Sequence, residues 1–201
     1  MGYRIRVLGT KEERPDIEHL RAALHESKNN AVLTVEAGEA ESWKQLILTH
    51  PQGPEIALIE CDPVVDGELG KEELEEFIAE VENYQPATGA RWLKEYLPRI
   101  KVIYALQLLS GTEVGDGWDA VHTVQSAIWN RSNGILQSDG EGFTNEDGYH
   151  ILWQFGSSAT GKWNMAILED GKWIRFQMDL GDLAQRKEFL AGAVPRNARR
   201  L

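Results

Sequence analysis

Polar and apolar positions alternate along the chain with two periods, and these periods predict short strands separated by helices. Residues 102–109 form an almost unbroken apolar run in which Gln107 is the one strongly polar member. Such a run predicts a strand that is covered on both faces. A helical period follows the glycine-rich break at 110–117. Its apolar stripe consists of Trp118, Val121, Val124 and Ile128.

Both ends of this helix carry capping residues. Asp116 stands at the expected N-cap, with Asp119 three positions later where a capping-box side chain reaches back. Asn133-Gly134 predicts the end of the helix, because either residue tolerates the left-handed backbone conformation. Two strands are predicted to follow, at 135–137 and at 149–155. The second alternates, with its aromatic residues on one face.

The first part of the chain shows the same order of elements. Its predicted elements are a strand at 3–8, a helix at 16–27 with Asp16 at the cap, and strands at 31–37 and 55–60. Segments 3–60 and 101–155 therefore predict tandem strand-helix-strand-strand units in an α+β fold, with pseudo-twofold symmetry and a cleft between them. In element order this arrangement resembles the gyrase-inhibitor-like ligand-binding domains, and the resemblance implies that the two units enclose a binding cleft.

The rest of the chain predicts connecting and terminal elements. These are a short helix at 39–48, a helical hairpin connector at 71–98, a β-hairpin at 162–180, a short helix at 182–191 and a mobile basic tail at 195–201. The hairpin prediction rests on Asp170-Gly171, because these residues supply the positive φ angles of a tight turn. No stretch is long enough to be a linker between independent domains, so the sequence predicts a single domain over 1–201.

Composition narrows the class of partner. The chain has 201 residues, 42% of them hydrophobic, and seven tryptophans, which is ample for a core. Its formal net charge of −11 argues against a nucleic-acid partner and against adhesion to an anionic membrane. The acidity is concentrated at 60–82, where ten carboxylates accompany Lys71 as the one basic residue. This block predicts either a surface for a basic protein partner or a solvated helix face.

The single cysteine, Cys61, excludes an intramolecular disulfide and predicts a reducing, cytoplasmic location. A buried role as a small apolar side chain is favoured over a nucleophilic one, since no histidine lies near it in the sequence. The chain shows neither a signal peptide nor an apolar stretch long enough to cross a membrane.

Segment 138–148 is the most unusual candidate for chemistry, because it is rich in both acids and glycine. Its spacing does not match a calcium-binding loop, so a hairpin connection is favoured. Asp139 and Glu141 lie at the end of a predicted strand, where paired carboxylates are able to perform acid–base chemistry. The histidines show no ligand spacing, and neither a nucleophile elbow nor a phosphate-binding loop is present. The sequence therefore predicts neither metal nor cofactor and favours a protein that is not an enzyme.

Tryptophan provides the remaining functional signal, because aromatic surface is typical of binding sites. The candidate ligand-binding residues are Trp118, Asp139, Glu141, Trp153 and Trp173, of which Trp118 and Trp173 are expected to be partly exposed. The favoured function is binding of a small amphipathic ligand or of a protein partner, in or near the cleft. The alternatives are a toxin-neutralising, immunity-type protein with an acidic face and a hydrolase using Asp139 and Glu141. An aromatic patch exposed beside the terminal hairpin would indicate a homodimer.

Overall fold

The computed structural model describes residues 2–201 and has an α+β fold, as the sequence predicts. The chain divides into two compact units. Unit 1 consists of the chain up to Glu72 together with Ile100–Gly134, and unit 2 consists of Glu73–Arg99 and Ile135–Leu201. No helix among the described residues combines the length and the apolar character needed to span a membrane.

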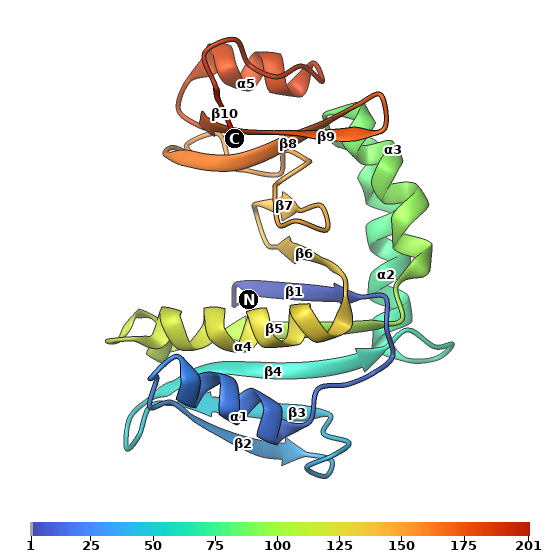
Figure 1. The fold of residues 1–201 in the computed structure, drawn as a ribbon. Coiled ribbons are helices and arrows are strands. Elements are labelled where there is room, and N and C mark those ends of the chain that lie inside the picture. Colours follow the sequence, from blue (N-terminus) through green and yellow to red (C-terminus); the bar gives the residue numbers. More distant parts are fainter. Residues whose placement is uncertain (1) are drawn as a thin grey trace. The chain divides into compact units, whose positions relative to one another are not determined.

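The five strands of unit 1 pair in the order β2-β3-β4-β5-β1, and every neighbouring pair is antiparallel. These strands are β1 (Arg4–Gly9), β2 (Val32–Ala37), β3 (Gln45–Thr49), β4 (Glu55–Pro63) and β5 (Val102–Leu108). The helical elements are α1 (Ile17–Glu26), the 3-10 turn η3 (Ser110–Glu113) and α4 (Gly117–Ser132). The two α-helices of this unit lie side by side on one face of the strands (Figure 1).

β5 is an interior strand, as its apolar run predicts. It pairs with β4 on one side and with β1 on the other, and residues 102–106 are all buried. Burial at successive positions means that both faces of the strand are covered, since side chains alternate across a sheet.

The predicted helix at 39–48 is wrong, because its second half forms β3. Leu46, Ile47 and Leu48 are consecutive and all buried, which is the pattern of an interior strand covered on both faces. The three-residue step from Trp43 to Leu46 resembles a helical period by coincidence. Trp43 is fully buried and its indole nitrogen donates a hydrogen bond to the carbonyl oxygen of Pro15 at 2.8 Å.

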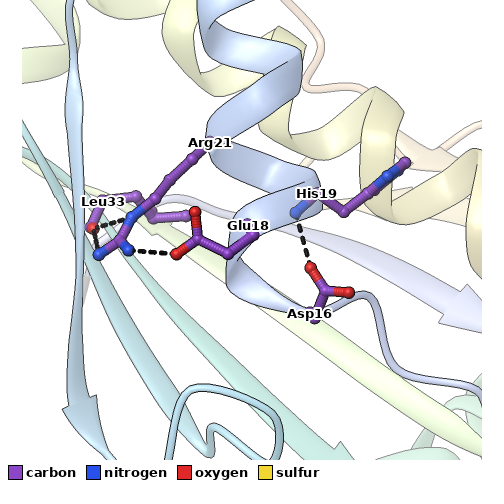
Figure 2. A network of polar contacts seen from close by, with 5 residues as sticks. All are labelled: Asp16, Glu18, His19, Arg21 and Leu33. Atoms are coloured by element: carbon purple, nitrogen blue, oxygen red, sulfur yellow. Dashed lines mark hydrogen bonds and ion pairs between the residues drawn. The ribbon is translucent and has the colours of Figure 1, made fainter.

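Two of the three capping predictions are confirmed. The Asp16 side chain accepts a hydrogen bond from the backbone of His19 at 2.7 Å and starts α1 (Figure 2). Asn133 ends α4 with a φ of 52°. Asp116 is the N-cap residue of α4, as predicted, but its side chain makes no capping bond. One of its carboxylate oxygens lies 3.7 Å from Nδ1 of His50.

The predicted duplication of 3–60 and 101–155 is not confirmed. In the first segment three strands follow the helix, whereas in the second only two short strands follow it. The first strands of the two segments pair with one another within unit 1, from Arg4 opposite Gln107 to Gly9 opposite Val102. The pseudo-twofold symmetry and its cleft stay predictions.

Unit 2 contains the predicted C-terminal hairpin. Its strands are β6 (Ile135–Ser138), β7 (Gly142–Phe143), β8 (Lys162–Glu169), β9 (Lys172–Asp179) and β10 (Arg199–Arg200). Its helices are α3 (Ala87–Tyr96) and α5 (Leu183–Leu190), with the 3-10 turns η1 (Val81–Asn83) and η2 (Leu97–Arg99), and the boundary between the units falls within α2 (Leu69–Glu80). Asp170 and Gly171 form the β8–β9 turn with φ angles of 46° and 76°, so the hairpin prediction is confirmed.

Two predictions for the C-terminal half are wrong. The tail at 195–201 was expected to be mobile, but β10 pairs with β9 within it. Segment 149–155 is irregular, and His150 alone makes isolated bridges, to Thr144 and to Met165. Ile151 and Leu152 are adjacent and both fully buried, so burial in this segment does not alternate as a half-buried strand requires.

The Gly134→Ala substitution is expected to destabilise the protein by about 2 kcal/mol or more. A Cβ at this position would stand 1.9 Å from the carbonyl oxygen of Leu8, so backbone would have to move. Gly156→Ala is the matched control, because no heavy atom lies within 4 Å of its added Cβ. Urea unfolding followed by circular dichroism measures both variants. Equal midpoints would contradict the close approach of Gly134 to β1.

Candidate functional site

A groove of about 780 Å³ lies between α1 and α4 in unit 1. The α1 side is lined by His19, Ala23, Glu26 and Ser27, followed by Lys28 and Asn29. The α4 side is lined by Asp116, Asp119, His122, Thr123, Ser126, Ala127 and Asn130. On each helix these positions recur every three or four residues, so each side of the groove is a single helical stripe.

The groove exists because small side chains lie where the two helices approach each other. Ala23 and Ala127 stand in the two facing stripes, and Ala127 is 8% exposed. The larger apolar side chains of α1 and α4 are buried on other faces. They are Ile17, Leu20 and Leu24 on α1, and Val121, Val124 and Ile128 on α4. The groove therefore has a floor that contains alanine and walls made of polar side chains.

Hydrogen bonds hold the end of α1 against the beginning of α4. The Asn29 side-chain amide donates to the backbone carbonyl of Asp116 at 3.2 Å, and its oxygen accepts from the amide of Ala31 at 2.8 Å. The hydroxyl of Thr123 donates to the backbone carbonyl of Asp119 at 2.7 Å and lies 3.4 Å from the hydroxyl of Ser27. Asn29 is buried, so its two bonds are shielded from competing water. These contacts fix the width of the groove at this end.

Arg21 ties α1 to the strand at the edge of unit 1. Its guanidinium donates to the carbonyl oxygen of Leu33 in β2 from Nε at 3.2 Å and from Nη2 at 2.8 Å. Its remaining nitrogen pairs with the Glu18 carboxylate at 2.6 Å, as Figure 2 shows. The helix that forms one wall is thus anchored on the side away from the groove.

The groove carries an excess of negative charge. Glu26, Asp116 and Asp119 are carboxylates in its lining, and Lys28 is the one lining residue with a permanent positive charge. Unit 1 has the same sign, with seventeen acidic and ten basic side chains and hence a formal net charge of −7. A surrounding field of this sign attracts cations.

The five predicted site residues fall in both units. Trp118 belongs to unit 1 and is 36% exposed, which agrees with the exposure predicted for it. Its ring centroid lies 5.6 Å from that of His122, one of the residues that line the groove. Trp118 therefore stands beside the groove, whereas the other four residues belong to unit 2.

The unit 2 candidates occupy a turn and an aromatic cluster. Asp139 and Glu141 are half-buried in the β6–β7 turn, where the Glu141 amide donates to the carbonyl of Ser138 at 3.1 Å. Trp153 packs on Phe155 at 5.2 Å and lies beneath the guanidinium of Arg186. Trp173 packs edge-on against Trp92 at 5.2 Å. Both tryptophans are half-buried, in agreement with the partial exposure predicted for Trp173.

The groove residues were missed in the sequence, although they leave a signal there. His19, Ala23 and Ser27 are spaced by four residues, as are Asp119, Thr123 and Ala127. Each set adds a small or polar stripe beside an apolar one. Such a stripe is recognisable as a potential seam only when the second helix is known to lie against it.

No cluster of three or more His, Cys, Asp or Glu side chains suited to a metal ion occurs within residues 2–201. Cys61 is 3% exposed, which confirms its predicted burial. Burial raises the pKa of its thiol to about 11, so the thiol remains protonated and a weak nucleophile at neutral pH.

Comparison of the chain with family models, with curated proteins and with solved structures finds no match. The resemblance to gyrase-inhibitor-like domains came from the predicted order of elements alone, and the observed strands do not confirm that order.

His150 belongs to the aromatic cluster of unit 2. Its ring lies 5.0 Å from that of Trp163 and 5.5 Å from that of Phe155. Its Nδ1 atom is buried and has no hydrogen-bond partner among the described residues. Burial lowers the pKa of His150 from 6.5 to about 4, although a hydrogen bond with the backbone of Glu141 opposes this shift.

Acid is therefore expected to destabilise the protein through His150. Between pH 6.5 and about 4 the unfolded chain binds a proton at this position that the folded chain does not. The neutral imidazole makes its full contribution to the free energy of unfolding above pH 6.5. This contribution decreases as the pH falls, by up to about 3 kcal/mol. The His150→Phe substitution should remove this part of the pH dependence, measured by urea unfolding at a series of pH values. His25→Gln, at an exposed position, is the control, and an unchanged slope in H150F would contradict the assignment.

Proposed function

We propose that this chain is a non-catalytic binding protein that receives a positively charged segment of a protein partner in the α1–α4 groove. The observation that supports this function best is the lining of the groove, in which three carboxylates accompany one lysine along two facing helical stripes. Opposite charges across an interface increase the rate of encounter and exclude partners of the wrong sign.

The shape of the groove favours a protein segment over the small amphipathic ligand that the sequence also suggested. Pockets for such ligands are enclosed and mostly apolar. Here the groove is open to solvent along two helices, and the apolar side chains in its lining are those of Ala23 and Ala127. An extended or helical segment is able to contact both walls at several points, as in helix-in-groove recognition.

The charge of unit 1 suggests a class of partner. A strongly basic protein would be attracted both by the groove and by the net charge of −7 around it. A basic toxin neutralised by this chain, as in the immunity-type alternative, is one member of this class. The hydrolase alternative depends on Asp139 and Glu141 of unit 2, and it stays a prediction.

A lysine- and arginine-rich peptide of about 20 residues spans about 30 Å when it is helical. This peptide is expected to bind ¹⁵N-labelled protein at the groove. Amide signals of α1 and α4 should shift, and binding should weaken steeply as salt is raised from 0.05 to 0.5 M, since exposed charges are screened. Ala23→Trp fills the groove and should weaken binding by roughly tenfold.

Ala22→Trp is the matched control, because Ala22 lies on α1 but is exposed and does not line the groove. Asp119→Lys tests the charge without filling the groove, and thermal unfolding checks that each variant folds. Binding of an acidic peptide at the same amides, or equal weakening by A22W and A23W, would overturn the proposal.

A further inference from the structure

The geometry beside the groove points to the chemistry of the side chain that it selects. Resting on the proposed function, we infer that Trp118 and the carboxylates next to it recognise an arginine side chain of the partner. The guanidinium would lie on the indole face and bond to the carboxylate of Asp119 in the groove. An aromatic face and carboxylates attract the same ligand, a cation, for independent reasons.

Trp118 is exposed where the other large aromatic side chains are not. Trp118 is the one aromatic residue among the exposed large apolar side chains of residues 2–201, and the others are Val32, Val65, Leu69, Val114, Leu183 and Leu201. Tryptophan buries a large apolar area when it packs in a core. Because Trp118 is 36% exposed, part of the apolar area of its ring does not contribute to the stability of the fold. Its position beside the groove makes its ring available to a bound partner.

The indole is held in place before any partner binds. Its Nε1–H donates to the carboxylate of Glu113 at 3.2 Å. On the other side its ring packs on that of His122, with the planes inclined at 40°. A side chain fixed at two points loses little entropy when a ligand stacks on it, which is how preorganisation increases affinity.

Three acidic residues lie close to Trp118 in the sequence. Glu113 accepts the hydrogen bond from its indole nitrogen, and Asp116 and Asp119 lie two residues before it and one residue after it, with the Asp116 side chain 50% exposed. Acids in this part of α4 also interact favourably with the helix dipole. The dipole alone does not account for an exposed, immobilised indole among them, whereas cation recognition accounts for both.

Arginine fits this arrangement better than lysine. A guanidinium is planar and weakly hydrated, so it is able to stack on the indole while its edge bonds to a carboxylate. The lysine ammonium is a compact and strongly hydrated charge, and it loses more hydration on the same surface.

The test uses three peptides of identical length in which the basic positions are all arginine, all lysine or all citrulline, which is the uncharged analogue of arginine. The arginine peptide should bind most tightly and should shift the Trp118 indole N–H signal, assigned by its loss in Trp118→Leu. Trp118→Leu should weaken binding of the arginine peptide by roughly tenfold and remove the preference for arginine over lysine. Trp118→Phe keeps an aromatic face and should retain most of the preference.

Val114→Ala is the control, because Val114 is exposed in the segment just before α4 but has no aromatic face. Equal binding of the arginine and citrulline peptides, or wild-type affinity in W118L, would overturn the inference. Its failure is distinguishable from that of the proposed function. If A23W weakens the basic peptides while W118L does not, the groove binds a basic segment without arginine selection; if neither variant has an effect, the groove is not the site.

Discussion

The antiparallel pairing of β1 with β5 is the constraint on which the candidate site depends. It joins residues 4–9 to residues 102–107, which are about a hundred positions away in the chain. Because α1 follows β1 and α4 follows β5, this pairing brings the two helices side by side. Neither helix has a groove of its own, since each contributes one stripe of polar and small residues. The site is therefore a consequence of one long-range strand pair.

Several local interactions convert this proximity into a defined surface. Asn29 connects the end of α1 to the beginning of α4, and Arg21 fastens the outer side of α1 to β2 (Figure 2). Ala23 and Ala127 keep the space between the helices open, because their side chains are too small to fill it. Larger residues there would close the seam as they do in an ordinary helix pair. The polar walls then determine the charge of whatever enters.

The tryptophans differ in burial, and this difference separates those that stabilise the fold from the one proposed to bind a partner. Trp43 is fully buried in unit 1 and donates its indole hydrogen to a carbonyl group, as a core tryptophan must. Trp153 is half-buried at the edge of the core of unit 2, where it packs on Phe155 and Phe189 beneath the guanidinium of Arg186. Trp118 has a partner for its indole nitrogen but keeps part of its ring exposed. Trp118 is the most exposed tryptophan of residues 2–201, and its ring is therefore the one most available to a bound partner.

The amino-acid sequence by itself determined the elements whose formation depends on neighbouring residues. The Asp16 cap, the Asn133 helix end and the Asp170-Gly171 turn each result from chemistry within a few positions, and β5 is recognisable from its own apolar run. Tertiary structure alone decided that 45–49 is a strand, because burial on both faces removes the alternation that distinguishes a strand from a helix. It also decided that 149–155 is irregular although its sequence alternates, because Ile151 and Leu152 are adjacent and both buried. It also decided the groove, since its two stripes become a site only where β1 pairs with β5. Periodicity records which side of an element is buried, but the identity of the element that covers it depends on contacts between distant parts of the chain.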